Sequence, residues 1–175
     1  YENHTRNKEL LKYAQTDALT GLYNKETAEQ LTDELLSEDE NKYQAFLILD
    51  VDCFKQINDI YGHAVGDIVL QKFGKLLKGT FREGDILGRI GGDEFGVIMK
   101  NIQTKDIAMK KAEELLAKTQ AYKIDELKGN NISISIGIST APQDGDCYMD
   151  LYKRADQALY QAKRSGKARV CNYFS

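Results

Sequence analysis

The sequence is poor in the features that mark three common classes of protein. Its three cysteines, Cys53, Cys147 and Cys171, are odd in number and scattered, which argues against a disulfide framework and favours a reducing compartment. No apolar run approaches the roughly 20 residues of a membrane-spanning helix, and no signal peptide is recognisable. The formal net charge of -3 argues against a general nucleic-acid surface, which would need an excess of basic residues. We therefore expect this segment to contact neither a membrane nor nucleic acid, although a local cluster could still bind one nucleotide.

What is present is the composition of an ordinary globular domain. With 175 residues, of which 42% are hydrophobic and 29% charged, the chain is long enough to bury one core. There are no internal repeats and no low-complexity segments. The chain begins at Tyr1 without an initiator methionine, so we expect it to be a piece of a longer protein. We expect a cytoplasmic domain, and membrane anchoring of the parent protein stays open.

Helical and strand patterns interleave along the chain, which predicts an α+β fold with helices packed on a mixed sheet. The expected helices lie at 1–15, 25–36, 53–77 (with a break near residue 62), 104–120 and 148–165. The expected strands are a central, doubly covered one at 45–49, two hairpin arms at 86–90 and 95–99, a half-buried one at 132–139 and an edge strand at 170–174. Turn and cap residues at 16–24 precede the second helix, and 38–42 reads as a charged loop.

Two β-capable runs meet at Gly91 and Gly92, which predicts a tight hairpin because glycine reaches positive φ without steric cost. Asp93 and Glu94 follow the turn directly. Adjacent strand residues point to opposite faces, so one acid can face a ligand while its neighbour has another role. A hairpin that only has to turn would be served by Asn-Gly. The alternative explanation for the two acids is a solvated turn.

Asp50 ends a continuous apolar strand, and α/β proteins place ligands at the mouth of a sheet. A Mg²⁺ ion needs only one or two carboxylates together with phosphate oxygens and water. Asp50, the main-chain carbonyl of Val51 and Asp93 would suffice if the two strands pair. For Asp52 we expect a structural role, as the N-cap of the helix that begins near residue 53.

Phe54 and Lys55 lie at that helix start, where free N–H groups and the helix dipole favour phosphate. They also exclude a calcium-binding EF-hand, which needs Asp or Asn followed by Gly at these two positions. Lys163 and Lys167 lie four residues apart at the end of the last helix, where we expect them on one face and able to grip a polyphosphate. Their alternative is a basic helix C-terminus that complements the dipole.

Asn58 and Asp67 flank the helix break at Gly62 and form a candidate base pocket. Guanine presents two neighbouring donors, N1–H and N2–H₂, and a carboxylate accepts both in a fork. Adenine lacks that pair, so an aspartate in a base pocket indicates guanine. The alternative is that both residues cap helices around the break. We expect His63 to be a cap or surface residue and not a metal ligand.

Arg82 and Asp85 offer a second candidate contact for a guanine nucleotide. The arginine could stack on the base or bind phosphate, and the aspartate could accept from guanine in the same fork. The alternative is a surface salt bridge.

Five segments, in order along residues 17 to 170, closely resemble the GGDEF family of diguanylate cyclases. They are Asp17–Asn24 (DALTGLYN), Asp50–Asp59 (DVDCFKQIND), Tyr61–Asp67 (YGHAVGD), Gly91–Phe95 (GGDEF) and Ala158–Lys163 (ALYQAK).

The resemblance implies condensation of two GTP molecules into cyclic di-GMP with release of two pyrophosphates. It implies that Asp50, the Val51 carbonyl and Asp93 hold Mg²⁺, two ions per active half-site, with Mn²⁺ as an alternative. Two metal ions that bridge the attacking and leaving oxygens supply the physical logic. Glu94 would be indispensable, as a metal ligand or as the base that helps the ribose 3′-OH attack an α-phosphate.

The resemblance also implies two sets of nucleotide contacts. The substrate-binding residues that it implies are Asn58, Asp67, Phe54, Lys55, Lys163, Lys167, Gly91 and Gly92. Asn58 and Asp67 would read guanine, and the terminal phosphates would lie at Lys55 and within reach of Lys163. Arg82 and Asp85 match the family's RxxD product-inhibition site.

The implied fold is a mixed, mainly antiparallel five-stranded sheet surrounded by helices, similar to class III nucleotidyl cyclases and polymerase palms. Two like substrates must face each other, so the working unit would be a two-fold homodimer with one GTP per half. Residues 1–16 would be the end of a linker or signalling helix and residues 17–175 the cyclase domain. An upstream sensory or regulatory domain would lie in the parent chain.

Two departures from the family pattern concern basic residues. Lys167 stands where the family usually has Arg in Gly-Arg-Asn, which loses the bidentate guanidinium and predicts weaker triphosphate affinity. Lys25 likewise replaces a usual Arg. Neither removes a metal ligand or the catalytic acid, so we expect an active enzyme. The alternatives are a receptor that binds GTP or cyclic di-GMP without turnover, and a purely structural dimerisation domain.

Overall fold

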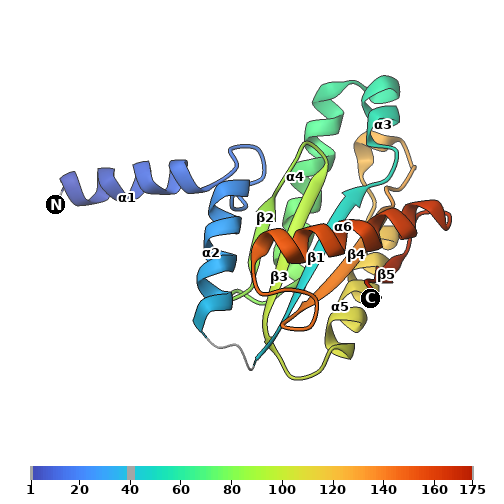
Figure 1. Ribbon diagram of the computed structural model, residues 1–175. Helices are drawn as coiled ribbons and strands as arrows, with labels where there is room; N and C mark the ends of the chain where they lie inside the picture. The colour runs from blue at the N-terminus through green and yellow to red at the C-terminus, as the bar shows by residue number, and fades with distance from the viewer. Residues whose placement is uncertain (1, 39–41, 175) are drawn as a thin grey trace.

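The computed structural model describes residues 2–38 and 42–174, and the expected helices and strands are present there (Figure 1). The helices are α1 (Glu2–Gln15), α2 (Lys25–Glu38), α3 (Phe54–Tyr61), α4 (His63–Thr80), α5 (Asp106–Ala121) and α6 (Tyr148–Arg164), with a short 3₁₀ turn at Asp125–Leu127. The strands are β1 (Tyr43–Val51), β2 (Ile86–Arg89), β3 (Glu94–Ile102), β4 (Ile134–Ala141) and β5 (Val170–Asn172). Most of the loop predicted at 38–42 lies outside the described residues.

The strands form one five-stranded sheet in the order β2-β3-β1-β4-β5. All neighbours run antiparallel except β4 and β5, which are parallel. The prediction of a mixed, mainly antiparallel sheet is therefore confirmed. The apolar run of β1 lies at the centre, as expected for a strand that is covered on both faces.

Helices cover both faces of the sheet, and alternate residues of β1 belong to the two resulting cores. Leu47 and Leu49 lie in the cluster that includes α4 and α5, whereas Phe46 and Ile48 lie in the cluster that includes α2 and α6. In Figure 1, α6 crosses in front of the sheet and α4 lies behind it. Asp50 has the same parity as Ile48, so its side chain belongs to the face that α6 covers.

The prediction that the isoleucine-rich strand is half-buried is wrong, because every residue of β4 is buried. Helices pack on both of its faces, and its serines find internal partners. Ser139 donates its hydroxyl to the Leu151 carbonyl at 2.7 Å. A Cβ on Gly137 would lie 2.1 Å from the carbonyl oxygen of Ala155, so glycine lets α6 lie directly on the strand.

The hairpin between β2 and β3 is confirmed, but its glycines do not have the expected conformation. Neither Gly91 nor Gly92 has φ in the left-handed region. The Arg89 side chain holds the turn instead, since its Nε and Nη2 donate to the Gly92 carbonyl at 3.1 and 2.8 Å. Its Nη1 donates to the Asp17 carboxylate at 3.2 Å. A Cβ on Gly92 would meet nothing within 4 Å, so this glycine leaves open space above the turn.

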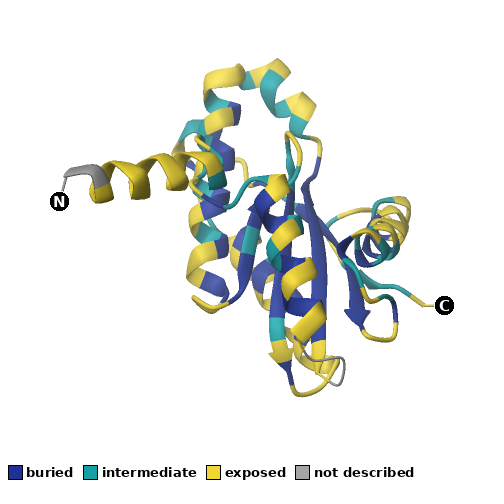
Figure 2. Cartoon of the chain, turned by 60° about the vertical axis from the view of Figure 1, so that its left-hand side comes forward, coloured by how far each residue is buried: buried dark blue, intermediate teal, exposed yellow. Residues whose placement is uncertain are grey.

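Helix α1 extends away from the rest of the chain (Figure 1), and Figure 2 shows it exposed along most of its length. Leu10 and Leu11 are 59% exposed and Tyr13 is 79% exposed. No helix in the described part of the chain is both long enough and apolar enough to cross a membrane. The three cysteines are free thiols.

Candidate active site

The ends of β1 and β3 bring three acidic residues together at one edge of the sheet. Asp50 is the register partner of Glu94, and the N–H of Val51 donates to the carbonyl of Asp93 at 3.3 Å. Asp93 precedes the strand, so strand alternation does not separate it from Glu94, and all three carboxylates act electrostatically on Lys163. The alternation of adjacent strand residues does not apply to Asp93, which lies outside the strand, and its carboxyl is close enough to Asp50 to raise the pKa of that residue, as the expected meeting of the two requires.

Asp50 is buried without a full set of partners. It is 8% exposed, its Oδ2 accepts a hydrogen bond from the Lys163 ammonium, and its buried Oδ1 has no hydrogen-bond partner in the described part of the chain. The pKa of its carboxyl is raised to about 6, chiefly because burial disfavours the charged form. Lys163 opposes this rise and the neighbouring Asp93 carboxyl adds to it. A second carboxylate and an unpaired buried oxygen fit a divalent cation, whose ligands are oxygen atoms.

Glu94, the first residue of β3, is partly buried beside α6. The Tyr152 hydroxyl donates to its Oε1 at 2.8 Å. Burial raises the pKa of the Glu94 carboxyl; the Tyr152 hydrogen bond lowers it and the nearby Asp156 carboxylate raises it again. The Glu94 carboxyl therefore binds a proton more tightly than an exposed glutamate does, and it lies at the edge of a groove.

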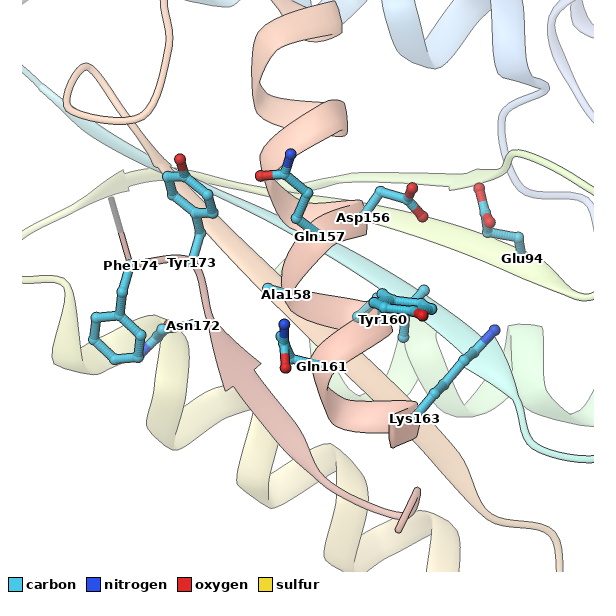
Figure 3. A pocket seen from close by; sticks show the side chains of 11 residues that line it. Glu94, Asp156, Gln157, Ala158, Tyr160, Gln161, Lys163, Asn172, Tyr173 and Phe174 are labelled. Carbon is cyan, nitrogen blue, oxygen red and sulfur yellow. The ribbon is translucent and has the colours of Figure 1, made fainter. Parts of the chain in front are cut away.

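A groove of about 570 Å³ runs from Glu94 along the outer surface of α6 (Figure 3). Asp156, Tyr160 and Lys163 line it from the helix, and the segment that includes Tyr173 lines its other side. In Figure 3, Asp156 and Lys163 project from α6 on the side where Glu94 lies. The groove is large enough to admit part of a small ligand beside these charged groups.

Helix α3 begins directly beside the acids. Its N-cap residue, Cys53, has φ of 57° and forms no side-chain cap, so the side chains leave the N–H groups of the first turn uncapped. Lys55 is exposed, and Phe54 packs against the core with its half-buried ring. This helix start retains the character of an anion site that its sequence predicts.

The prediction that Lys163 and Lys167 share one helix face is wrong, because α6 ends at Arg164. Lys167 lies beyond it in the left-handed region with φ of 62°, after Gly166 at 117°. The two lysines nevertheless stay near the candidate site. Lys163 reaches Asp50, and the Lys167 ammonium lies 3.3 Å from the Cys53 sulfur at the start of α3.

Asp52 does not cap α3, so its predicted role is wrong. Its two carboxylate oxygens accept from the hydroxyls of Ser133 and Ser135, each at 2.7 Å, and from the N–H of Ala168 at 3.2 Å. Asp52 therefore ties β1 to β4 and to the segment that carries Lys167.

Asn58 lies in α3 and Asp67 in α4, and neither forms a side-chain cap at the break between these helices. A Cβ on Gly66 would lie 1.9 Å from Asn58 Oδ1, so glycine is required for this approach. Asp67 is exposed, and neither side chain has a hydrogen bond to another described residue. The capping alternative loses support. His63 is exposed at the start of α4, as expected.

Arg82 and Asp85 form the ion pair that was the alternative to a nucleotide contact, at 3.3 Å. Asp85 is 7% exposed and also accepts from the N–H groups of Arg82 and Lys100, at 3.1 and 3.0 Å. A separate cavity of about 590 Å³ lies over this pair, and Lys8 and Lys12 of α1 and Lys78 of α4 also line it. The ion pair thus lies in the wall of a basic cavity.

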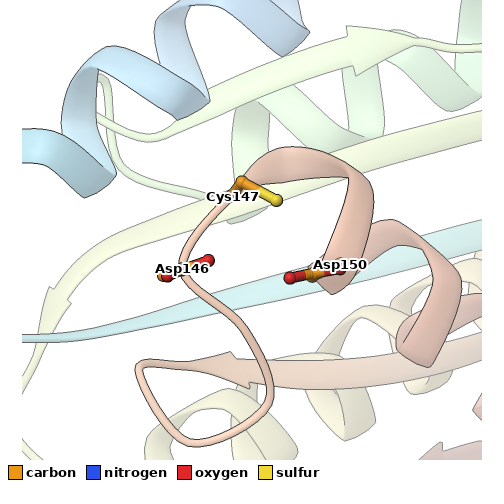
Figure 4. Close-up of side chains that lie close together, drawn as sticks. All are labelled: Asp146, Cys147 and Asp150. Carbon is orange, nitrogen blue, oxygen red and sulfur yellow. The ribbon is translucent and has the colours of Figure 1, made fainter.

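A further acidic group lies at the opposite end of α6 (Figure 4). Candidate ligand atoms of Asp146, Cys147 and Asp150 lie within 4.8 Å of one another. Acidic residues are favourable at a helix N-terminus because they complement the dipole, which accounts for this grouping without a ligand.

The sequence reasoning missed Tyr152 and Asp156, which flank Glu94 from α6. A signal was available, because Tyr152 precedes Lys163 by 11 residues, or about three helical turns, and therefore shares its face.

Comparison with known proteins explains this arrangement. A family model described as "Diguanylate cyclase, GGDEF domain" matches residues 14–169, which is most of the chain. The chain belongs to the GGDEF family. The resemblance of its five motifs is thereby confirmed.

Curated relatives are longer proteins. Diguanylate cyclase A of Treponema denticola is 37% identical over 170 residues, which cover 94% of this chain and 46% of the relative. Response regulator PleD of Caulobacter vibrioides is 37% identical over 177 residues, which cover 97% of this chain and 39% of the relative. The chain thus spans less than half the length of these relatives.

Solved structures confirm the fold. The GGDEF domain of TpbB (YfiN) from Pseudomonas aeruginosa superposes with a TM-score of 0.86 at 33% identity, covering 91% of this chain and 94% of that one. The coiled coil and GGDEF domain of DgcB from Caulobacter crescentus, in complex with c-di-GMP, gives a TM-score of 0.89 at 25% identity, covering 98% and 92%.

Proposed function

We propose that this chain is a diguanylate cyclase domain that condenses two GTP molecules into cyclic di-GMP and releases two pyrophosphates. The observation that carries the proposal is the convergence of Asp50, at the end of β1, with Asp93 and Glu94, at the start of β3, beside an uncapped helix start with lysines around it. Membership of the GGDEF family supports the same reaction.

The residues that would hold Mg²⁺ are Asp50, the Val51 carbonyl and Asp93, with two ions per half-site as the proposal. The unpaired buried oxygen of Asp50 supports this assignment. When bound, Mg²⁺ neutralises triphosphate charge and stabilises the attacking and leaving oxygens. The carboxylates of Asp50 and Asp93 would hold the metal beside Glu94.

The triphosphate would lie between the start of α3 and the two lysines. Uncapped N–H groups after Cys53 donate to phosphate oxygens, and Lys55 is exposed for the same purpose. Lys163 reaches the strand end from α6, and Lys167 reaches the helix start. Open space above Gly92 supports close approach of the nucleotide to the hairpin.

Guanine would be read by Asn58 and Asp67. Asp67 is exposed and the side chains of both residues lack internal hydrogen bonds among the described residues, so their polar atoms are available to a base. A carboxylate that accepts from N1–H and N2–H₂ selects guanine over adenine. Asp67→Ser is expected to relax the preference for GTP over ATP, measured as a ratio of kcat/KM values.

Glu94 would act on the attacking ribose hydroxyl, either as its base or through the metal. Its pKa is raised by burial, which moves the carboxylate toward the proton affinity that a general base needs near neutral pH. The 3′-OH must come from a second nucleotide, because each half-site as assigned holds one GTP.

A two-fold homodimer would present the two nucleotides to each other. The exposed apolar side chains of α1, Leu10, Leu11 and Tyr13, support a linker helix that associates with its counterpart in a second copy. An upstream regulatory domain in the parent protein would then control the pairing through this helix.

Product inhibition would occur at Arg82 and Asp85. The basic cavity over them, with lysines from α1 and α4, supports binding of a doubly charged dinucleotide, and DgcB was solved in complex with c-di-GMP. Arg82→Ala is expected to raise the product concentration needed for half-inhibition by about tenfold, from the loss of a charged contact. An unchanged inhibition curve would mean that Arg82 and Asp85 form only a structural ion pair and do not bind the product.

The test of the activity is incubation with GTP and Mg²⁺, with pyrophosphate and cyclic di-GMP measured together. Because the proposed reaction needs two copies of the domain, the assay should include the chain fused to a dimerising coiled coil. Formation of both products in a 2:1 ratio supports the proposal. Product binding without turnover would indicate a receptor, and neither activity would indicate a structural domain.

A further inference from the structure

Tyr152 holds the carboxylate of Glu94 from the opposite element of the site. Its hydroxyl donates to Glu94 Oε1 at 2.8 Å across the gap between α6 and β3. We propose that Tyr152 is a positioning residue that fixes the orientation of Glu94 for the attack of the ribose hydroxyl. The inference rests on the proposed function.

The tyrosine ring itself is fixed by its neighbours. It packs edge-on against Phe46, with ring centroids 6.4 Å apart, and stacks on Tyr148 at 5.9 Å. The helix that carries it lies directly on β4 at Gly137, where a side chain would collide with main-chain atoms of α6. The hydroxyl of Tyr152 therefore has one well-defined position relative to the sheet.

Glu94 depends on this contact for its orientation. No other hydrogen bond to its side chain occurs within the described residues, and Oε2 remains for a ligand in the groove. Asp156 projects from α6 on the side where Glu94 lies, and its carboxylate repels the carboxylate of Glu94 (Figure 3). Without the tyrosine hydroxyl, a side chain with three rotatable bonds would move away from Asp156 and sample several rotamers.

The chain contains a matched control for this role. Tyr148 lies one helical turn before Tyr152 and stacks on it, but its buried hydroxyl has no hydrogen-bond partner among residues 2–38 and 42–174. Tyr152→Phe and Tyr148→Phe remove the same atom from adjacent rings of one stack. Only the first change removes a contact with Glu94.

The experiment compares the two variants with the wild-type chain, all in the same dimerised form, with GTP and Mg²⁺. We expect Tyr152→Phe to lower kcat by about 10- to 100-fold, the scale expected when a reacting group is misplaced by up to about 1 Å. KM for GTP should stay within about twofold, because the hydroxyl contacts no proposed nucleotide ligand. Tyr148→Phe should leave both constants within about twofold, since it removes an unsatisfied buried group.

A second measurement is independent of turnover. A crystal structure of the metal-free Tyr152→Phe chain should show the Glu94 carboxylate displaced or in more than one rotamer, while the wild type shows one. An unchanged kcat, or Glu94 in its wild-type position in the variant, would overturn the positioning role. An inactive wild-type chain would instead contradict the proposed cyclase function. The crystal structures would still decide whether Tyr152 positions Glu94.

Discussion

Asp50 and Asp52 lie two residues apart at the end of β1 and are almost equally buried, at 8% and 7% exposure, yet their surroundings differ. Both oxygens of Asp52 are occupied, by the hydroxyls of Ser133 and Ser135 and the N–H of Ala168. Asp50 accepts a hydrogen bond from a lysine on one oxygen, and its other oxygen has no hydrogen-bond partner among the described residues. The fold satisfies one acid internally and leaves its neighbour incomplete.

The difference separates a structural carboxylate from a functional one. A buried acid with a full set of donors stabilises the fold, whereas a buried acid without them destabilises it and is retained where a ligand completes its shell. Asp52 holds together the segments around the candidate site, whereas Asp50 offers a buried oxygen to the metal ion of the proposed function.

The largest expected effect comes from Asp50→Asn. This change removes a charge from the proposed metal site, so the rate of cyclic di-GMP synthesis should fall about a thousandfold or more. Such a fall corresponds to the loss of about 4 kcal/mol of transition-state stabilisation. The measurement is initial rate of pyrophosphate release with saturating GTP and Mg²⁺. Glu113→Gln, an exposed acid-to-amide change on α5, is the control and should retain the wild-type rate. Comparable rates for the two variants would show that Asp50 has no role in the reaction and does not differ from Asp52 in function.

The opposite behaviour is expected at Asp52. Asp52→Ala leaves two serine hydroxyls and the N–H of Ala168 without their acceptor, so the free energy of unfolding should fall by about 2–4 kcal/mol. Urea unfolding monitored by circular dichroism measures it. A loss below 0.5 kcal/mol would mean that solvent replaces the carboxylate and that Asp52 is not the structural member of the pair.

A pH-dependent difference should distinguish the two acids further. The pKa of Asp50 is raised in the folded protein from 3.8 to about 6, so the folded state holds this proton more tightly than the unfolded chain. Its contribution to stability therefore falls as pH rises from about 4 to about 6 and stays low above that range. Without metal, Asp50→Asn should be more stable than the wild type by up to about 3 kcal/mol at pH 7, with the difference vanishing below about pH 4. A difference that does not depend on pH would contradict the burial account.

The smallest effect is expected at Lys163. Its ammonium lies on Asp50 in this structure and would contact phosphate during turnover, so Lys163→Met should raise KM for GTP by about tenfold. Lys153→Met, an exposed change on the same helix, is the matched control. An equal KM for both variants would place the triphosphate away from α6.

The sequence predicts the acids at the strand ends because local pattern decides them: Asp50 ends an apolar run and Asp93 follows a turn. Prediction from the sequence fails where the hydrogen-bond partner of a side chain comes from a distant segment of the chain. Asp52 looks like an N-cap because a helix follows it, but Ser135 on β4 and Ser133 just before that strand donate to its two oxygens. The spacing of Tyr152 to Lys163 places both residues on one helix face, but no local pattern identifies its hydrogen-bond partner, Glu94, 58 residues away on β3.

Helix ends account for another failure. A periodic pattern places Lys163 and Lys167 on one face, yet the chain leaves the helix after Arg164 and turns through three successive positive-φ residues. Glycine at 166 signals such a stop, but the direction of the following segment depends on the Asp52 contact to Ala168.

One measurement tests the central claim most directly: a crystal structure of the chain soaked with Mn²⁺ and a non-hydrolysable GTP analogue, with the metal located by anomalous scattering. We expect Mn²⁺ between the carboxylates of Asp50 and Asp93, with Lys163 moved from Asp50 to a phosphate oxygen. Metal bound elsewhere, with the Lys163–Asp50 pair intact beside an occupied nucleotide site, would contradict the account.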